Sequence, residues 1–301
     1  MLASARSAGK TVDFMGKTHV IEEMTENSFH DVDIALFSAG GSQSKQFAPA
    51  AVDAGCVVVD NSSAYRMDPS CPLVVPEVNP EEAKKHNGII ANPNCSTIIM
   101  NVPVWPLHQE FGVERVVVST YQAASGAGAA AMAELEQQAK DWIKKKPLTQ
   151  DIFGRQYMFN LFSHNSKIDP ETLYNEEETK MIRETKKIFK DDDIQVTATC
   201  VRVPVLRAHC ESVNLTFKKS VTPEQVREIL SRAPGVTVLD DLENEQFPEP
   251  IIASEEDDVF VGRIRQDPSQ PDNRGIELFI AGDQILKGAA LNAVQCAELL
   301  L

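Results

Sequence analysis

The chain of 301 residues is 43% hydrophobic and 24% charged, which are the proportions of a globular protein and leave room for two domains. Its net charge of −15 argues against a nucleic-acid partner or an anionic membrane surface, and no apolar run is long enough to span a membrane. Six cysteines without a Cys-x-x-Cys pair argue against a disulfide framework, and the six histidines lack the spacing of a metal site.

Residues 1–10 are small and basic, like the start of a transit peptide, but acidic, β-rich sequence follows at once. Ser4, Arg6 and Ser7 come just after a short strand start, where a dinucleotide fold holds the adenosine ribose. An arginine there accommodates the 2′-phosphate of NADP, whereas an acidic residue favours NAD. The same residues are equally compatible with a solvated basic turn, so both interpretations stay open.

Residues 33–94 alternate between apolar strands and helical or polar stretches. We expect a helix from about Ser44 to Ala54 and strands at residues 33–37, 56–60, 73–75 and 89–90. Continuous apolar strands predict a parallel sheet covered on both faces, which is the doubly wound, Rossmann-type α/β fold. Ligands bind such sheets at the carboxyl ends of the strands, here residues 38–42 and 61–66, although neither segment contains a complete Gly-x-Gly-x-x-Gly.

After residue 94 the pattern changes to that of a second domain. A strand at residues 115–121 runs into a Gly/Ala-rich loop at 122–128, and a long helix follows. The next expected elements are an irregular stretch (147–170), a helix (175–189), two half-buried antiparallel strands (194–200 and 210–217), a helix opened by Thr222-Pro223-Glu224, two strands (259–264 and 275–281) and a last helix (287–301). We therefore predict an α+β domain with a mixed or antiparallel sheet.

The stretch Asn92-Pro93-Asn94-Cys95-Ser96-Thr97 lies where the two patterns meet. Pro93 ends a strand, Asn94 can cap a helix, and Cys95 falls at or near the first turn of that helix. The first N–H groups of a helix carry the positive end of its dipole, which favours the nucleophilic thiolate. A lone cysteine is more often a buried core residue, so the interpretation depends on the other residues that accompany Cys95.

Arg202 and His209 are the residues that decide between these interpretations, and a bend at Pro204 separates them. A histidine near a cysteine thiolate forms an acid/base pair. An arginine in the same pocket recognises a carboxylate through two parallel hydrogen bonds. Each residue alone is better explained as part of a strand or a surface, but together with Cys95, the Gly/Ala loop and a nucleotide-type sheet they indicate an enzyme site.

The whole chain resembles the aspartate-β-semialdehyde dehydrogenases. The resemblance rests on residues 3–10, 37–40, 59–66, 74–79, 92–97, 120–128, 202–209 and 286–292. Asn-Cys-Ser-Thr together with Ser-Gly-Ala-Gly and an Arg-x6-His pair is a specific combination of motifs. The loop at 159–165 looks more like the plant and algal branch of that family than like the common bacterial one.

The resemblance implies reversible, NADPH-dependent reduction of β-aspartyl phosphate to aspartate semialdehyde and phosphate, toward lysine, methionine, threonine and isoleucine. It implies that Cys95 is the nucleophile that forms a thioacyl enzyme, His209 the acid/base and Gln122 the residue that orients the intermediate. The implied substrate-binding residues are Arg202 for the carboxylate, Glu177 and Lys180 for the amine and phosphate, Arg66 for the phosphate, and Asn94. The implied NADP-binding residues are Ser4, Arg6, Ser7, Ser38, Gly40, Ser125, Gly126 and Asn292.

The chain departs from this family's pattern at its start, because the opening strand and its Gly-x-x-Gly-x-Val-Gly turn, which cradles the pyrophosphate, precede the first residue. We expect a chain without that βα unit to bind NADP weakly and to exchange amide hydrogens quickly at residues 33–60. Three alternatives to the main interpretation are a related acyl-phosphate reductase, an impaired fragment that acts only as a dimerisation or interaction protein, and a Cys–His protease.

The expected domain boundaries assign residues 1–94 and 287–301 to an incomplete NADP-binding domain. They assign residues 95–286 to a catalytic and dimerisation domain. We expect a homodimer or a dimer of dimers that acts on a small-molecule substrate, without nucleic acid, membrane or metal. The expected location is the cytoplasm or the plastid stroma.

Overall fold

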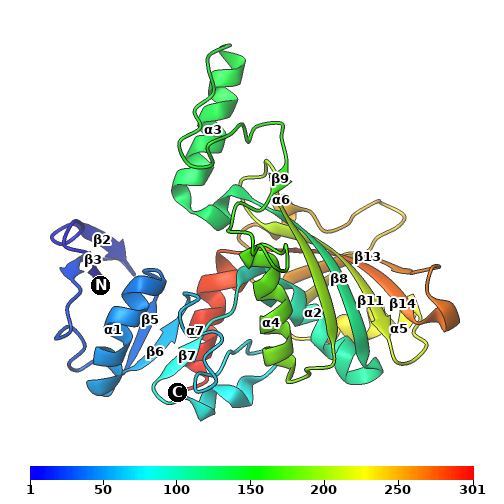
Figure 1. The fold of residues 1–301 in the computed structure, drawn as a ribbon, viewed down its shortest axis with the longest axis horizontal. Coiled ribbons are helices and arrows are strands. Elements are labelled where there is room, and N and C mark those ends of the chain that lie inside the picture. Colours follow the sequence, from blue (N-terminus) through cyan, green and yellow to red (C-terminus); the bar gives the residue numbers. More distant parts are fainter. The chain divides into compact units, whose positions relative to one another are not determined.

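The computed structural model describes residues 1–301, which divide into two units with separate sheets (Figure 1). Unit 1 consists of Met1–Val74, Glu81–Asn92 and Ala293–Leu301, and unit 2 consists of Val75–Pro80 and Pro93–Asn292. No helix in either unit has the length and apolar character needed to cross a bilayer.

A three-stranded parallel sheet forms the centre of unit 1. Its elements are β5 (Ile34–Phe37), α1 (Gly41–Asp53), β6 (Val57–Asp60), β7 (Ile89–Ala91) and the later part of α7 (Leu291–Glu298), with the strands in the order β5-β6-β7. On one face, Phe47 of α1 packs in a cluster with Phe37. On the other face, Ala293 and Cys296 of α7 pack in a cluster with Ile90 (Figure 1). The predicted parallel sheet, covered on both faces, is confirmed.

Two small pairs of strands precede this sheet in unit 1. They are β1 (Leu2–Ala3) with β4 (Glu22–Glu23), which are parallel, and the hairpin of β2 (Thr11–Phe14) with β3 (Lys17–Val20). The strand expected at residues 73–75 is wrong, because this buried segment makes only one isolated parallel bridge, between Leu73 and Ala91. Pro72 and Pro76 flank the triplet, and proline has no N–H group to contribute to a ladder.

A seven-stranded mixed sheet dominates unit 2. In spatial order its strands are β12 (Val236–Val238), β13 (Val259–Gln266), β14 (Gly275–Gly282), β11 (His209–Phe217), β8 (Val113–Gln122), β10 (Gln195–Arg202) and β9 (Phe162–Ser163). β11 is antiparallel to both β8 and β14, as expected. β10 is antiparallel to β9 but parallel to β8, so the expected antiparallel pairing holds for only one of its two neighbours. The helix that precedes β10, α4 (Glu176–Phe189), returns the chain to the end of the sheet at which β8 begins. This is the crossover that a parallel pair of strands needs.

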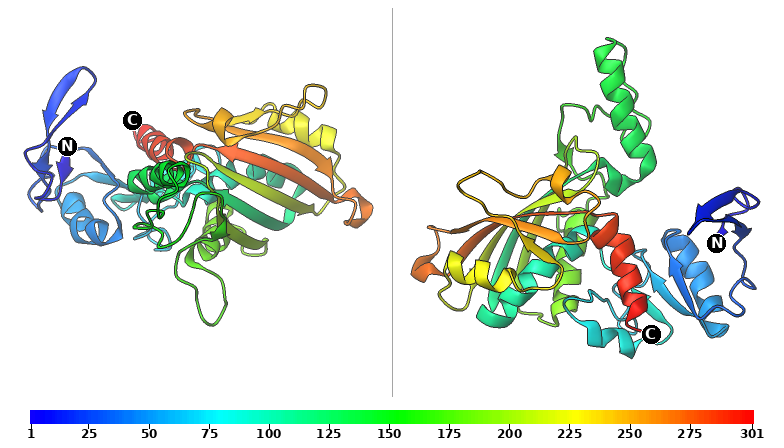
Figure 2. Two further views of the ribbon diagram at one scale, coloured as in Figure 1. Left: turned by 90° about the horizontal axis from the view of Figure 1, so that it is seen from above. Right: turned by 180° about the vertical axis from the view of Figure 1, so that it is seen from behind.

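Three of the five helices of unit 2 begin at a capping side chain. The helices are α2 (Cys95–Phe111), α3 (Ala129–Ile143), α4, α5 (Pro223–Leu230) and α6 (Pro250–Ala253), with short 3-10 turns at η2 (Ala124–Ala127) and η3 (Pro271–Asn273); a further 3-10 turn, η1 (Pro80–Lys85), lies almost wholly in unit 1. Asn175 caps α4 and Thr222 caps α5, each through a reciprocal capping box. α2 and α5 lie along one face of the sheet (Figure 2). α3 projects from the unit, and the irregular segment that follows packs Phe153 and Tyr157 against it (Figure 1).

The end of the chain differs from the single helix expected at residues 287–301. A π-helical turn, η4 (Leu286–Ala290), comes first, α7 follows, and the last residues form turns. Gly288 in this turn lies so close to Cys95 that an added Cβ would be 3.0 Å from the Cβ of that cysteine. The widened turn therefore brings backbone up against the start of α2, and π turns of this kind occur often at functional sites.

Candidate active site

Cys95 is the first residue of α2 and the only one of the six cysteines that is not buried. The side chain of Asn94 caps the helix by accepting a hydrogen bond of 3.2 Å from the N–H of Thr97. The carboxylate of Glu184 accepts the N–H of Asn94 at 2.6 Å, which satisfies another donor at this helix end. The expectation that Cys95 lies in the first turn of a helix is confirmed, and the interpretation as a buried core cysteine is wrong.

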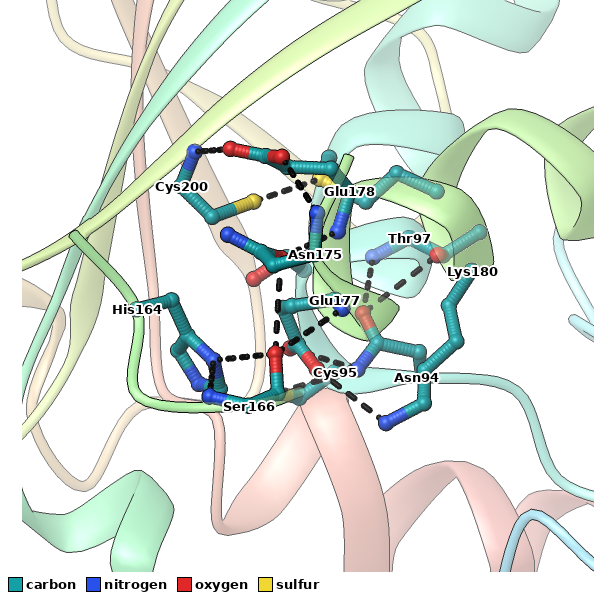
Figure 3. A network of polar contacts seen from close by, with 12 residues as sticks. Asn94, Cys95, Thr97, His164, Ser166, Asn175, Glu177, Glu178, Lys180 and Cys200 are labelled. Atoms are coloured by element: carbon teal, nitrogen blue, oxygen red, sulfur yellow. Dashed lines mark hydrogen bonds and ion pairs between the residues drawn. The ribbon is translucent and has the colours of Figure 1, made fainter. Parts of the chain in front are cut away.

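The carboxylate of Glu177, in the first turn of α4, gathers three of the expected site residues. Its Oε1 accepts hydrogen bonds from the amides of Asn94 (2.7 Å) and Gln122 (3.1 Å), and its Oε2 lies 3.3 Å from the ammonium of Lys180 (Figure 3). Burial would raise the pKa of this carboxyl, but Lys180, His164 and the two amides together lower the pKa to about 2. Glu177 is therefore a buried, ionised group beside Cys95.

Gln122 ends β8, and its amide Nε2 also donates a 2.6 Å hydrogen bond to the hydroxyl of Ser96. The amide is thus held between the first turn of α2 and the first turn of α4. Its Oε1 is buried and has no hydrogen-bond partner in the chain.

His209 begins β11 and is completely buried. Its Nδ1 accepts the N–H of Ala123 at 3.0 Å, so in the neutral ring the hydrogen is on Nε2, which has no partner. Burial and then the nearby charge of Arg202 lower the pKa of His209 to about 3. The ring is consequently a neutral Nε2–H donor at physiological pH.

Arg202 ends β10 with its guanidinium buried beside the same loop. Its Nη1 donates to the carbonyl of Ala123 at 3.1 Å and its Nε to the side chain of Asn165 at 3.4 Å. A Cβ added to Gly126 would lie 2.9 Å from both Arg202 Nη1 and His209 Nε2. Glycine at position 126 therefore allows the loop to cross directly over both side chains.

The structure brings the expected catalytic and substrate-binding residues of unit 2 together around the start of α2 and the ends of β8, β10 and β11. They are Cys95, Asn94, Gln122, Glu177, Lys180, Arg202 and His209, joined by Ser125 and Gly126. Asn292 lies at the start of α7, directly after η4, and Lys287 donates to its Oδ1 at 3.0 Å. The other expected residues belong to unit 1.

The unit 1 residues occupy turns and a helix start. Ser4, Arg6 and Ser7 lie in the turn after β1, where the N–H of Ser7 donates to the carbonyl of Ser4. Ser38 follows β5. Arg66 is buried, with hydrogen bonds from Nε to the carbonyl of Asn92 (2.8 Å) and from Nη2 to that of Asn61 (3.0 Å).

Two family models match the chain: "Semialdehyde dehydrogenase, NAD binding domain" at residues 1–86 and "Semialdehyde dehydrogenase, dimerisation domain" at residues 104–287. The aspartate-semialdehyde dehydrogenase of Synechocystis sp. is 54% identical over 301 residues, which cover 100% of this chain and 88% of that relative. The enzyme of the same name from Bacillus subtilis is 46% identical and is matched over 99% of this chain and 88% of its own length. The chain belongs to the aspartate-semialdehyde dehydrogenase family.

Solved structures of the family have the same fold. Aspartate semialdehyde dehydrogenase II from Vibrio cholerae superimposes with a TM-score of 0.95 at 44% identity, over 99% of this chain and 88% of that one. The structure from Candida albicans superimposes with a TM-score of 0.75 at 24% identity. As a member of this family the chain is an NADP-dependent oxidoreductase of amino-acid biosynthesis, and its matched dimerisation domain makes a homodimer.

The residues that the structure presents fit NADP. Gly40 precedes α1 at the carboxyl end of β5 with φ 90°, it makes no side-chain capping bond, and nothing lies within 4 Å of an added Cβ. An open helix start of this kind accepts a phosphate group. In this aspartate-semialdehyde dehydrogenase fold the start of α1 is therefore open at Gly40, within the expected ligand-binding segment 38–42.

Several residues that contact the expected site residues or the Gly/Ala loop were not predicted from the sequence. They are Ser96, His164, Asn165, Ser166, Glu184 and Gln284. Gln284 holds the Gly/Ala loop, because its Nε2 contacts the hydroxyl of Ser125 and its Oε1 accepts the N–H of Ala208. Three of them had a signal: Ser96 lies in the stretch 92–97 that carries the resemblance, and His164 and Asn165 lie in the loop at 159–165.

Proposed function

We propose that the site around Cys95 catalyses the reversible, NADPH-dependent reduction of β-aspartyl phosphate to aspartate semialdehyde and phosphate. The observation that carries this proposal is the position of the only unburied thiol at the start of α2, beside the ionised Glu177 and the amide of Gln122. The substrate has a carboxylate, an amine and a phosphate, and the site residues include cations and a carboxylate that complement these groups.

In this proposal the Sγ of Cys95 attacks the acyl carbonyl, the bond to the phosphate oxygen breaks, inorganic phosphate leaves with the bonding electron pair and the thiol proton, and a thioacyl enzyme forms. Gln122 orients that group, and His209, as the acid/base, donates a hydrogen bond from its Nε2–H to the acyl oxygen. Arg202 binds the substrate carboxylate. Glu177 binds the amine with the help of Asn94, and Lys180 and Arg66 bind the phosphate. The thioester divides one difficult acyl reduction into two easier steps.

NADPH supplies the hydride for this reaction when it is bound. We propose that Ser4, Arg6 and Ser7 hold its 2′-phosphate, and that Ser38 and Gly40 lie by its other phosphates. Ser125, Gly126 and Asn292 line the nicotinamide position. The open start of α1 at Gly40 supports the phosphate assignment.

We propose residues 1–94 and 287–301 as the NADP-binding domain and residues 95–286 as the catalytic and dimerisation domain. The separate sheets of the two units support this arrangement. A dimer of dimers and a location in the cytoplasm or plastid stroma remain proposals, which light scattering and imaging of a tagged full-length protein test.

Cys95→Ala tests the central assignment. The variant should lose phosphate-dependent oxidation of aspartate semialdehyde, because no other group replaces the thiol, while its circular dichroism spectrum stays unchanged. Cys71→Ala, which removes a buried thiol of unit 1, is the matched control and should retain activity. Iodoacetamide should label Cys95 before the other cysteines, because it alone is not buried. More than a trace of turnover in Cys95→Ala would overturn the assignment, and a preference for acetylglutamyl or glyceraldehyde phosphate substrates would favour a related reductase.

A further inference from the structure

A second row of polar side chains lies behind the site, on the same face of the sheet of unit 2. β8 and β11 are antiparallel, and Glu211 of β11 pairs directly with Thr120 of β8. His209 precedes Glu211 by two residues, and Gln122 follows Thr120 by two residues. Because side chains alternate along a strand, all four side chains point to the same face of the sheet.

These four residues contain most of the unsatisfied polar atoms of the chain. Seven buried side-chain nitrogen or oxygen atoms lack a hydrogen-bond partner, and five of them are Thr120 Oγ1, Gln122 Oε1, His209 Nε2 and both carboxyl oxygens of Glu211. All four residues are at most 1% exposed. Native structures leave few buried polar groups unpaired, so a cluster of this size indicates a network with protons or ordered waters at its centre.

Glu211 and Glu177 are two buried carboxyls whose surroundings shift their pKa values in opposite directions. Glu177 has Lys180 and two amide donors, and its pKa is lowered to about 2. Glu211 has no ion pair, and both burial and the negative charge of Glu177 raise its pKa well above the ordinary value. Such divergent pairs indicate which carboxyl holds a proton.

None of the groups that face Glu211 is a cation that would offset a negative charge on its carboxyl. α4 contributes Glu177, β10 contributes the buried thiol of Cys200, and β14 places the apolar Ile280 opposite it. On its own strand the titratable neighbours are His209, which is neutral, and Cys210. A second negative charge here would oppose Glu177 at close range in a medium of low dielectric constant.

We propose that Glu211 works as a neutral carboxylic acid that positions Gln122 from behind the site. A protonated carboxyl has one O–H donor, and the carbonyl oxygen of Gln122 is an acceptor without a partner. The Nε2 of the same amide is already used by Ser96 and Glu177. The Glu211 proton, directly or through one ordered water with Thr120, completes the hydrogen bonding of the amide and fixes its orientation. Glu211 is thus a positioning residue, and its effect on turnover rests on the proposed function.

Glu211→Gln and Glu211→Leu separate this role from simple packing. Glutamine is neutral and keeps a donor, so Glu211→Gln should retain kcat within about threefold, whereas Glu211→Leu should lose about tenfold or more in kcat with little change in KM. The alkaline decline of wild-type kcat that reflects ionisation of Glu211 should be absent in Glu211→Gln. A folded Glu211→Gln variant that is as slow as Glu211→Leu, or a fully active Glu211→Leu variant, would overturn the proposal.

Two readouts do not depend on turnover and therefore distinguish this proposal from the proposed function. The infrared difference spectrum between wild type and Glu211→Gln at neutral pH should show the C=O band of a protonated acid; carboxylate bands alone would overturn the proposal. Because the folded-state pKa is raised, the stability contribution of Glu211 is present below pH 4.5 and is lost as pH rises. The folding equilibrium of wild type should therefore fall relative to that of Glu211→Gln by up to tenfold per pH unit above 4.5, and a ratio independent of pH would contradict it.

Discussion

The planar guanidinium of Arg202 makes hydrogen bonds in fixed directions from different nitrogens, which the point charge of a lysine ammonium does not do. One nitrogen is fixed to the carbonyl of Ala123 and another to Asn165, and no hydrogen bond of the structure uses its Nη2. A lysine ammonium cannot hold the loop carbonyl and a substrate carboxylate in this geometry.

Arg202→Lys should accordingly lose nearly as much kcat/KM as Arg202→Ala, roughly 100-fold, because about 3 kcal/mol of charge-assisted hydrogen bonding is removed in both. Steady-state kinetics with aspartate semialdehyde measures this loss. Arg232→Lys, at an exposed pair with Glu228, is the control and should be unchanged. Near-normal kcat/KM in Arg202→Lys would contradict this role of the guanidinium.

Two histidines, the buried His209 and the partly buried His164, give the protein an acid-sensitive stability. Burial lowers the pKa of His209 to about 3 and that of His164 to about 4, from an ordinary value of 6.5. Between the ordinary value of 6.5 and the lowered pKa of each ring, the unfolded chain binds more protons than the folded chain. Stability therefore falls as pH falls below 6.5.

Chemical denaturation at several pH values from 7 to 5 should show this fall. Each histidine should lower the folding equilibrium constant by up to tenfold per pH unit. His164→Gln should reduce the slope by about one proton, while His19→Gln, an exposed histidine of the β2–β3 hairpin, should leave it unchanged. Equal slopes in all three proteins would show that the ring of His164 is not held neutral.

At the scale of single elements, the starts of helices were predictable because nearby capping residues determine them. Asn94 and Thr222 were recognisable as caps, and both helices begin where those residues indicate. The parallel pairing of β10 with β8 was not predictable from alternation, because α4 and the α3 segment between them decide the direction of return. For the same reason Cys95, Gln122 and His209 could be named from their motifs, whereas the opposite pKa shifts of Glu177 and Glu211 required their three-dimensional surroundings.

The π-helical turn η4 is anchored by a buried ion pair. Lys287 Nζ lies 2.5 Å from Glu77 Oε2, with side chains only 1% and 9% exposed. Removing one partner leaves an unpaired charge in the interior, which is costly, whereas removing both is tolerated better.

Lys287→Met should lower the free energy of unfolding by about 3–5 kcal/mol, and the double variant Lys287→Met/Glu77→Leu should recover much of this loss. Urea denaturation measures both. Lys85→Met, which breaks a surface pair with Glu82, is the control and should change stability by less than about 1 kcal/mol. A small effect of Lys287→Met alone would mean that the pair does not anchor η4.

At the scale of the whole molecule, the face of the large sheet opposite α2 carries aromatic side chains, and the four-residue α6 packs against part of this face through Ala253. Tyr121 of β8 is 37% exposed and packs against Phe279 of β14, with 6.2 Å between ring centroids. Each protomer of the homodimer needs an apolar surface of this kind for contact with its partner.

Tyr121→Glu/Phe279→Glu should therefore shift the dimer toward monomer, because a charge buried in an interface is unfavourable. Sedimentation velocity across a range of protein concentrations detects the shift. Met15→Glu, at an 86% exposed position on the β2–β3 hairpin, should leave the dimer intact. A dimer of wild-type affinity in the double variant would place the interface elsewhere on the molecule.

The sheet of unit 1 is covered on one face by the last nine residues of the sequence, and this has a consequence for synthesis. β7 ends at Ala91 and the covering segment starts at Ala293, a difference of 202 residues. At about 5–20 residues per second, a ribosome takes about 10–40 s to make that stretch. During this time Val59 and Ile90 on the nascent chain have no partner from α7, and exposed apolar strands are what chaperones bind. The sheet of unit 1 thus completes this face only after the intervening sequence of unit 2 has been made.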